Sequence, residues 1–277
     1  MTDVTIYGLY LAAGVVAGLV SGMFGLGGGL TIVPSLAVAL PLQGVVPEHV
    51  MHLAIGTSLA VMFFTALYTT FLRSRHGDLN WSLFWHLLPA VVLGTAIGAF
   101  AGGLLPGSIL RVFFIGFVAY MLLRGLHRHY RTSNKVQAID QSDSAPRMPS
   151  RVSRLASGVT TGLTGALLGA GAAIITVPYL QAAGYRIQTA SATAAALSAV
   201  IGIGAGSGYV LGGLGATALP TAAIGYLYLP AFAGMTAGAF VGSPLGVRIS
   251  HRMKETTQFR LFLAYLTVVL ISMVLPK

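Results

Sequence analysis

Two glycine-rich breaks interrupt the two longest apolar stretches of this chain. Residues 17–36 read AGLVSGMFGLGGGLTIVPSL, and residues 161–180 read TGLTGALLGAGAAIITVPYL. Because glycine lets the backbone leave a helix, a half-helix that starts at such a break points unpaired amide groups and the positive end of its dipole at the break. Groups of this kind bind anions. We therefore predict an anion site that includes Gly25, Gly27, Gly28, Gly29, Gly169 and Gly171. The alternative is that these glycines only allow close helix packing.

Polar side chains near the starts of neighbouring apolar stretches form a second group of candidates. Polar groups are costly in lipid and tend to face the interior of a helix bundle, and small hydroxyls with one imidazole suit an oxyanion. His52 matches Gln188 and Thr57 matches Thr193 between the two halves of the chain. The matching favours a shared site over the alternative of simple hydrogen bonds between helices. The predicted substrate-binding set is completed by Ser58, Thr31 and Thr176.

Carboxylates and thiols are missing from the places where most chemistry would need them. The six acidic residues all lie outside the middle of the apolar stretches, and the chain has no cysteine. A carboxylate proton relay and a metal centre are therefore not expected. The motifs of ATP hydrolysis and of familiar intramembrane hydrolases are absent. We expect a protein that is not an enzyme, has no cofactor and no metal, and takes a small anion as its substrate.

Composition places most of the chain in a lipid bilayer. Hydrophobic residues make up 55% of the chain and charged residues 8%, with a mean hydropathy of +0.82, whereas soluble domains carry about 25% charged residues. The chain starts with an apolar stretch that lacks a basic region and a cleavage site, so we expect a retained membrane helix. The net charge of +10 gathers in polar segments between apolar stretches, where Lys and Arg mark the cytoplasmic side. A nucleic acid partner is therefore not expected.

The distribution of positive charge decides how often the chain crosses the membrane. The stretches that contain the breaks, 5–40 and 155–184, are too long for one span and too short for two. If each turns back at its glycines, the basic clusters near Arg73, in 127–154 and in 244–257 all lie on one side. Eight simple crossings would put the last cluster on the opposite side from the others. We therefore predict five helical segments in each half, with both termini outside.

The predicted fold is an all-α polytopic membrane protein with two inverted repeats, each a glycine-broken hairpin followed by three transmembrane helices. The first transmembrane repeat covers 1–126, a basic cytoplasmic linker covers 127–154, and the second repeat covers 155–277. Internal similarity supports the duplication, because Gly25 matches Gly169 and Pro34 matches Pro178 at a constant offset of 144. An inner (cell) membrane location follows from this reading.

Two further groups of residues, glycine rows and arginines, have simpler explanations than substrate binding, namely helix packing and membrane topology. Glycines at four-residue spacing lie on one helix face and are predicted to allow close helix crossing: Gly94, Gly98 and Gly102, and Gly234, Gly238 and Gly242. Three arginines either attract anions to the cytoplasmic mouth or only mark the topology: Arg73, Arg75 and Arg186.

The chain resembles the sulfite exporter TauE/SafE family of membrane permeases through the motifs GLVSGMFGLGGGLTIVPSL, HLAIGTSLA, RSRHGDLNW and GLTGALLGAGAAIITVPYL. The resemblance covers nearly the whole chain apart from the linker. It implies transport of small sulfur-containing anions such as sulfite, sulfoacetate or organosulfonates, with export by alternating access. In the second copy Ala172 and Ala173 replace two glycines, so the halves are expected to contribute unequally.

Three alternatives to this transporter stay open at the level of sequence. They are an anion channel, a transporter of a different small organic anion, and a non-transporting membrane scaffold that binds through its linker. The oligomeric state also stays open, and a homodimer is one expectation.

Overall fold

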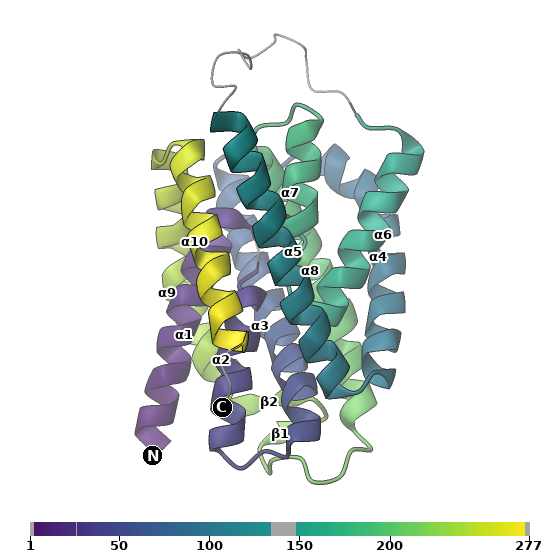
Figure 1. Cartoon of the computed structure of the whole chain (residues 1–277), viewed down its shortest axis with the longest axis vertical. Helices are drawn as coiled ribbons and strands as arrows, with labels where there is room; N and C mark the ends of the chain where they lie inside the picture. The colour runs from purple at the N-terminus through teal and green to yellow at the C-terminus, as the bar shows by residue number, and fades with distance from the viewer. Residues whose placement is uncertain (1–2, 26, 134–147, 275–277) are drawn as a thin grey trace.

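The computed structural model describes residues 3–25, 27–133 and 148–274, which form ten α-helices and one short β-hairpin (Figure 1). The first half contains α1 (Asp3–Phe24), α2 (Gly29–Leu42), α3 (Pro47–Arg75), α4 (Trp81–Leu104) and α5 (Gly107–Ser133). The second half contains α6 (Arg151–Leu168), α7 (Ala173–Ala182), α8 (Ile187–Gly213), β1 (Ala223–Ile224), β2 (Leu227–Tyr228), α9 (Leu229–Arg252) and α10 (Glu255–Val274). The all-α prediction is confirmed.

The helices that contain the breaks are short because glycine stops them. Gly25, Gly27 and Gly28 have φ angles of +75°, +66° and +83°, a left-handed conformation that side chains with a Cβ rarely adopt. The chain therefore leaves α1 and starts α2 within a few residues. Gly169, with φ +61°, ends α6 in the same way. With 14 and 10 residues, α2 and α7 reach only about 21 and 15 Å, less than the roughly 30 Å of a bilayer core.

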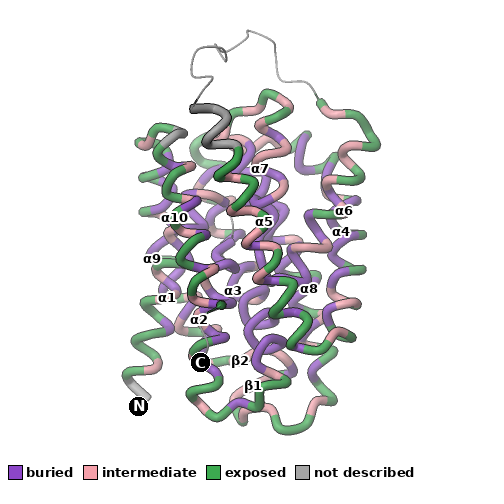
Figure 2. Tube along the Cα trace, viewed as in Figure 1, coloured by how far each residue is buried: buried purple, intermediate pink, exposed green. Residues whose placement is uncertain are grey.

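Six helices of the described residues are long and apolar enough to cross a membrane. They fall into an inner and an outer group. In α3 and α8, 78% and 61% of the most apolar window is buried, whereas α5 and α10 bury only 17% and 28%. Figure 2 shows the same division, with buried residues concentrated inside the bundle and exposed residues on its periphery. The exposed residues of α5 include Val112 and Leu123, which fits a surface that faces lipid.

The bundle is built from pairs of helices that belong to different halves. α1 packs along α9, α4 packs along α6, and α3 packs along α8 in the centre. Figure 1 places the β-hairpin and the start of α1 at one end, here called the hairpin end, and the end of α5 and the start of α6 at the other, here called the linker end. The two halves are thus interleaved and do not form separate units.

The glycine rows predicted to serve packing do so. A Cβ on Gly94 would lie 2.1 Å from the carbonyl oxygen of Val159 in α6, and one on Gly242 would lie 2.1 Å from that of Val15 in α1. These backbones therefore touch without side chains between them. Gly102 differs from the rest of its row, because it faces the hydroxyl of Tyr209 instead of a backbone.

The bounds of the predicted linker differ from the helix ends. α5 continues to Ser133 and α6 begins at Arg151, so the ends of 127–154 are helical. Residues 134–147 of that segment lie outside the described residues.

Candidate functional site

The two glycine breaks meet in the middle of the bundle. A Cβ on Gly29, the first residue of α2, would lie 1.9 Å from the carbonyl oxygen of Gly169, which caps α6. The contacts on either side correspond between the halves. Gly25 packs against the backbone of Ser191 in α8, and Gly169 packs against Ile55 in α3. We call this meeting of the breaks the glycine crossing. It unites six predicted site residues, of which Gly27, Gly28 and Gly171 are buried beside the three just named.

Two serines connect the central helices to the glycine crossing. The buried Ser58 of α3 donates to the carbonyl oxygen of Gly169 at 2.9 Å and lies 3.4 Å from that of Gly29. Ser198 of α8, also buried, accepts a hydrogen bond from the amide of Ala172 at 2.8 Å. Its single proton faces the carbonyl oxygen of Ala194 at 2.8 Å, and the carbonyl oxygen of Gly25 lies farther away at 3.5 Å. Both serines therefore bind the backbone of the second break, and each also lies near a carbonyl oxygen of the first break.

The two breaks are not equivalent in their surroundings. Ser198 already occupies the amide of Ala172, at the start of α7. In the first half the residue that matches Ser198 is Met62, whose Cγ would lie 2.3 Å from a Cβ on Gly27. A flexible apolar side chain therefore covers the first break where a hydroxyl binds the second. The expectation of unequal halves agrees with this difference.

A cavity of about 520 Å³ opens at the hairpin end of the bundle. This volume lies within the usual range of small-ligand pockets. Its walls come from the start of α3, the α4–α5 connection and the β-hairpin: Pro47, Glu48, His49, His52, Gly103, Leu104, Leu105, Pro106, Gly107, Ser108 and Tyr226. We call it the outer cavity.

His52 is the predicted site residue that lines the outer cavity. Its ring stacks on Tyr226 with centroids 4.8 Å apart, and its Nε2 lies 3.1 Å from the carbonyl oxygen of Leu105. Burial raises the pKa of the Tyr226 hydroxyl above its ordinary value, so this group stays neutral at neutral pH. The Oγ1 of Thr57 accepts a hydrogen bond from the amide of Tyr228 at 2.9 Å. Both predicted residues thus hold the β-hairpin against α3.

The hydroxyls of the remaining predicted residues and the carbonyl oxygen of Gln188 have partners other than the glycines of the crossing. Thr31 shares a hydrogen bond with the hydroxyl of Tyr265 at 2.9 Å, Thr193 donates to its own helix, and Thr176 lies 3.4 Å from the hydroxyl of Thr161. Gln188 lies at the start of α8, at the linker end, where its carbonyl oxygen faces Arg73. The structure therefore brings the glycines and Ser58 together but places His52 and Gln188 at opposite ends.

Sequence reasoning missed Ser198 and left Arg73 undecided. Ser198 lies one helical turn after Ala194, the residue that matches Ser58, so a search for buried hydroxyls one turn away would have found it. Of the arginines near the linker end, Arg75 and Arg186 are exposed and Arg73 is completely buried. The sequence signal for that difference is weak, because Arg73 and Arg75 stand two positions apart in one motif.

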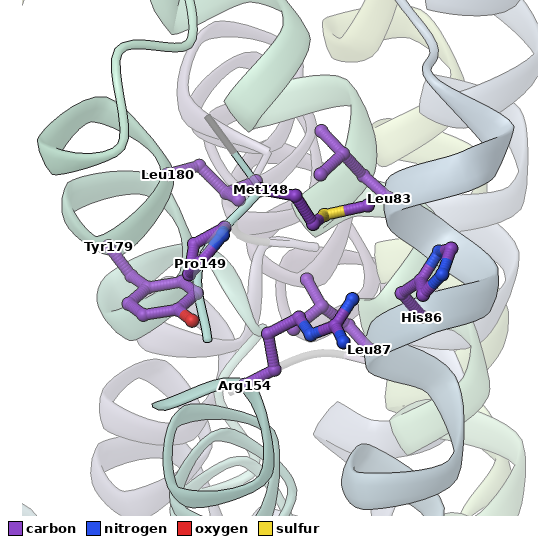
Figure 3. Close-up of a pocket in the computed structure, with 8 residues that line it drawn as sticks. All are labelled: Leu83, His86, Leu87, Met148, Pro149, Arg154, Tyr179 and Leu180. Atoms are coloured by element: carbon purple, nitrogen blue, oxygen red, sulfur yellow. The ribbon is translucent and has the colours of Figure 1, made fainter. Parts of the chain in front are cut away.

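A second, narrow depression lies at the linker end (Figure 3). Arg154 of α6 and His86 of α4 face it, with the hydroxyl of Tyr179 on the opposite wall. It involves the start of α6 and the linker ends of α4 and α7. It is therefore separate from the glycine crossing and from the outer cavity.

Replacing Ser198 with alanine is expected to destabilise the fold by about 1–3 kcal/mol, because the buried amide of Ala172 loses its acceptor. Thermal unfolding of the purified protein in detergent measures the effect. The matched control is Ser207→Ala in the same helix, where an exposed hydroxyl only bonds back to Gly204. Equal stability of the two variants would contradict the bonding described here.

Comparison with known proteins gives the family of the chain. The sequence profile of the family described as "Sulfite exporter TauE/SafE" matches residues 10–273. The chain belongs to this family. The TauE/SafE resemblance inferred from the four motifs is therefore confirmed, and it extends over both halves of the bundle. No solved structure matches the chain significantly.

Three curated relatives are similar along nearly their whole length. A "Probable membrane transporter protein" of Haemophilus influenzae is 30% identical over 267 residues, which cover 96% of this chain and 97% of the relative. "Probable membrane transporter protein MJ0441" of Methanocaldococcus jannaschii is 24% identical, with 88% and 86% covered. "Probable membrane transporter protein YunE" of Bacillus subtilis is 24% identical, with 90% of each covered. TauE/SafE membership and the six apolar helices make the chain a multi-pass membrane transporter.

Proposed function

We propose that this transporter exports small sulfur-containing anions, such as sulfite, sulfoacetate or organosulfonates, by alternating access. The observation that carries the proposal is the glycine crossing, where two broken helices from different halves meet inside a membrane bundle. Broken helices at the interface of two repeats form the substrate sites of many secondary transporters. The description of the family as a sulfite exporter family supports the substrate class.

The anion binds, in this proposal, on the side of the crossing formed by the first break, after the flexible side chain of Met62 moves away from Gly27. The amides at the start of α2 supply partial positive charge there, and Ser58 donates to the anion when its hydroxyl turns away from the carbonyl oxygen of Gly169. The first break is favoured because in the second half the amide of Ala172 is already bonded to Ser198. The outer cavity, with His52 and Tyr226 in its wall, serves as the vestibule between the crossing and the hairpin end.

We also propose that the halves are inverted repeats and that the linker end faces the cytoplasm of a cell with an inner membrane. The pairing of helices supports the first point. α1 with α9 and α4 with α6 are equivalent pairs if the halves exchange roles, and α3 pairs with its own counterpart α8. Basic residues at the linker end, including Arg151 and Lys254, support the second point through the loop-charge rule.

Flux through proteoliposomes tests the function. Liposomes that contain the protein should release radiolabelled sulfite faster than protein-free liposomes, and unlabelled sulfite inside should drive uptake of label from outside by exchange. An anion channel would conduct without exchange, so saturable counterflow separates the carrier from the channel. The same assay with sulfoacetate and acetate compares substrates. Failure of every tested anion to cross faster than in protein-free liposomes would contradict the proposal.

Single cysteines placed at the start of α5, next to the α4–α5 connection, and in the α9–α10 connection should be labelled from opposite sides of the membrane. These connections correspond between the halves, so inversion puts them on different faces. Ser108→Cys and Lys254→Cys suit the test because both residues are exposed and because the unaltered chain has no cysteine and gives no background. An impermeant maleimide applied to right-side-out and inside-out vesicles reports accessibility. Labelling of both positions from the same side would rule out inverted repeats.

A further inference from the structure

Arg73 is a completely buried cation in the last turn of a membrane-spanning helix. Its Nη2 donates to the carbonyl oxygens of Gly22 and Met23 at 2.7 and 3.2 Å. These carbonyls end α1, just before the first glycine break, so the guanidinium caps the broken helix where its dipole is negative. Arg75, two residues later, is exposed and lies over the ring of Phe71. Burial of a charge is costly in a membrane protein, and such residues commonly mark substrate paths.

The charge and the donors of Arg73 are incompletely matched by its neighbours. The nearest carboxylate oxygen, Oδ2 of Asp78, lies 3.8 Å from Nη1, and the Nε2 of His251 is closer to that oxygen at 3.1 Å. Neither Arg73 nor His251 forms a hydrogen bond to Oδ2 of Asp78. The buried Nε of Arg73 also has no hydrogen-bond partner among the described residues. A guanidinium carries five donors. Arg73 uses Nη2 for Gly22 and Met23 and Nη1 for the carbonyl oxygen of Gln188 at 3.5 Å, and so keeps capacity for an additional acceptor.

A line of buried polar side chains connects Arg73 with the glycine crossing. Ser58, Thr65, Thr69 and Arg73 are completely buried. Their spacing of seven, four and four residues places them on one face of α3. Ser58 contacts the crossing, and Thr69 lies 3.3 Å from the hydroxyl of Ser21 in α1. This face of α3 therefore presents polar groups to the first broken segment from the crossing to the linker end.

We propose that Arg73 binds the transported oxyanion on the linker side of the glycine crossing. The inference rests on the proposed function and adds the residue that meets the anion before or after the crossing. The planar fork of a guanidinium can hold two oxygens of a sulfite, sulfonate or carboxylate group at once. On binding, the oxygens of the anion take the free Nε donor of Arg73 and displace the carbonyl oxygens of Gly22 and Met23 from its Nη2. The end of α1 is released, so arrival of the anion and opening of the linker end become one event.

Arg73→Lys is the first test, because lysine keeps the charge but loses the fork. In the proteoliposome assay with radiolabelled sulfite, the concentration for half-maximal flux should rise about tenfold or more, as expected for losing a charge-assisted hydrogen bond. The matched control is Arg75→Lys, in which the exposed neighbour is changed and the sulfite dependence should stay as in the unaltered protein. A folded Arg73→Lys protein with an unchanged half-maximal concentration would overturn the inference.

Asp78→Asn is the second test, and it shows whether Arg73 binds the anion even if Arg73→Lys does not fold. Removing the carboxylate leaves Arg73 intact and frees its charge for the anion, so the half-maximal sulfite concentration should fall. If Arg73 only caps α1, this variant would change stability but not bring that concentration down, and an unchanged or higher value would overturn the inference. Should the unaltered protein fail to carry sulfite, sulfoacetate or acetate, the proposed function and this inference fall together. If the unaltered protein carries sulfite but the half-maximal concentration neither rises in Arg73→Lys nor falls in Asp78→Asn, only the role of Arg73 is contradicted.

Discussion

Replacing Gly29 with alanine is expected to abolish sulfite flux. The new Cβ would lie 1.9 Å from the carbonyl oxygen of Gly169 and about 3 Å from Ala170, which are backbone atoms that cannot rotate away. The two broken segments would have to separate. This would destabilise the fold by about 3 kcal/mol, the upper end of the usual range for overpacked cores. The amides of α2 and the hydroxyl of Ser58 would then no longer converge. Flux in proteoliposomes, normalised to the amount of folded protein, measures the result.

Gly116→Ala is the matched control for this substitution. Gly116 lies in α5, is exposed, and has no heavy atom within 4 Å of an added Cβ. Alanine there should leave flux unchanged and stabilise the helix by about 0.5–1 kcal/mol. Flux of Gly29→Ala at the level of Gly116→Ala would show that transport does not depend on the close meeting of the breaks.

Replacing Gly18 with leucine is expected to prevent folding. A Cβ on Gly18 would lie 2.3 Å from the carbonyl oxygen and 2.6 Å from the Cα of Ala239, so α1 and α9 would be pushed apart along their shared face. A loss of about 4 kcal/mol or more is expected, because a large side chain replaces a backbone contact in a buried interface. The yield of monodisperse protein after detergent extraction and its thermal unfolding measure the effect.

Gly8→Leu provides the comparison within the same helix. Gly8 is exposed at the hairpin end of α1, and nothing lies within 4 Å of an added Cβ. Leucine at this position should face lipid or solvent and leave the yield unchanged. If Gly18→Leu gave the same yield and stability as Gly8→Leu, the tight crossing of α1 and α9 would not be needed for folding.

The positions of the helix breaks could be predicted because they depend on local backbone chemistry. Side chains with a Cβ rarely adopt the φ angles found at Gly25, Gly27, Gly28 and Gly169, so clustered glycines in the sequence mark where α1 and α6 stop. The division of each long apolar stretch into two helices then follows from the length of the stretch, which is too great for one membrane span. The membrane class follows equally directly from the scarcity of charge.

The composition of the site could not be predicted to the same extent, because it depends on which ends of the helices meet. His52 and Gln188 occupy matching positions, but α3 begins beside the β-hairpin while α8 begins beside Arg73. Since the two helices run in opposite directions, Gln188 lies beside the end of α3, about 30 Å along that helix from His52. The spacing within α8 marks Ser198 as a candidate, but its role depends on a contact between α8 and the start of α7.

The replacement of a serine by Met62 in the first half has a consequence for the resting orientation of the carrier. In a transporter made of inverted repeats, the two access states differ by an exchange of conformations between the halves. A hydrogen bond available to only one half, such as Ser198 with Ala172, therefore lowers the free energy of one state alone. A net contribution of about 1 kcal/mol would bias the two populations roughly fivefold in the absence of substrate. The preferred starting direction of the cycle would then depend on this pair together with Ser58 and Ala194, where only the residue of the first half carries a hydroxyl that bonds the glycine crossing.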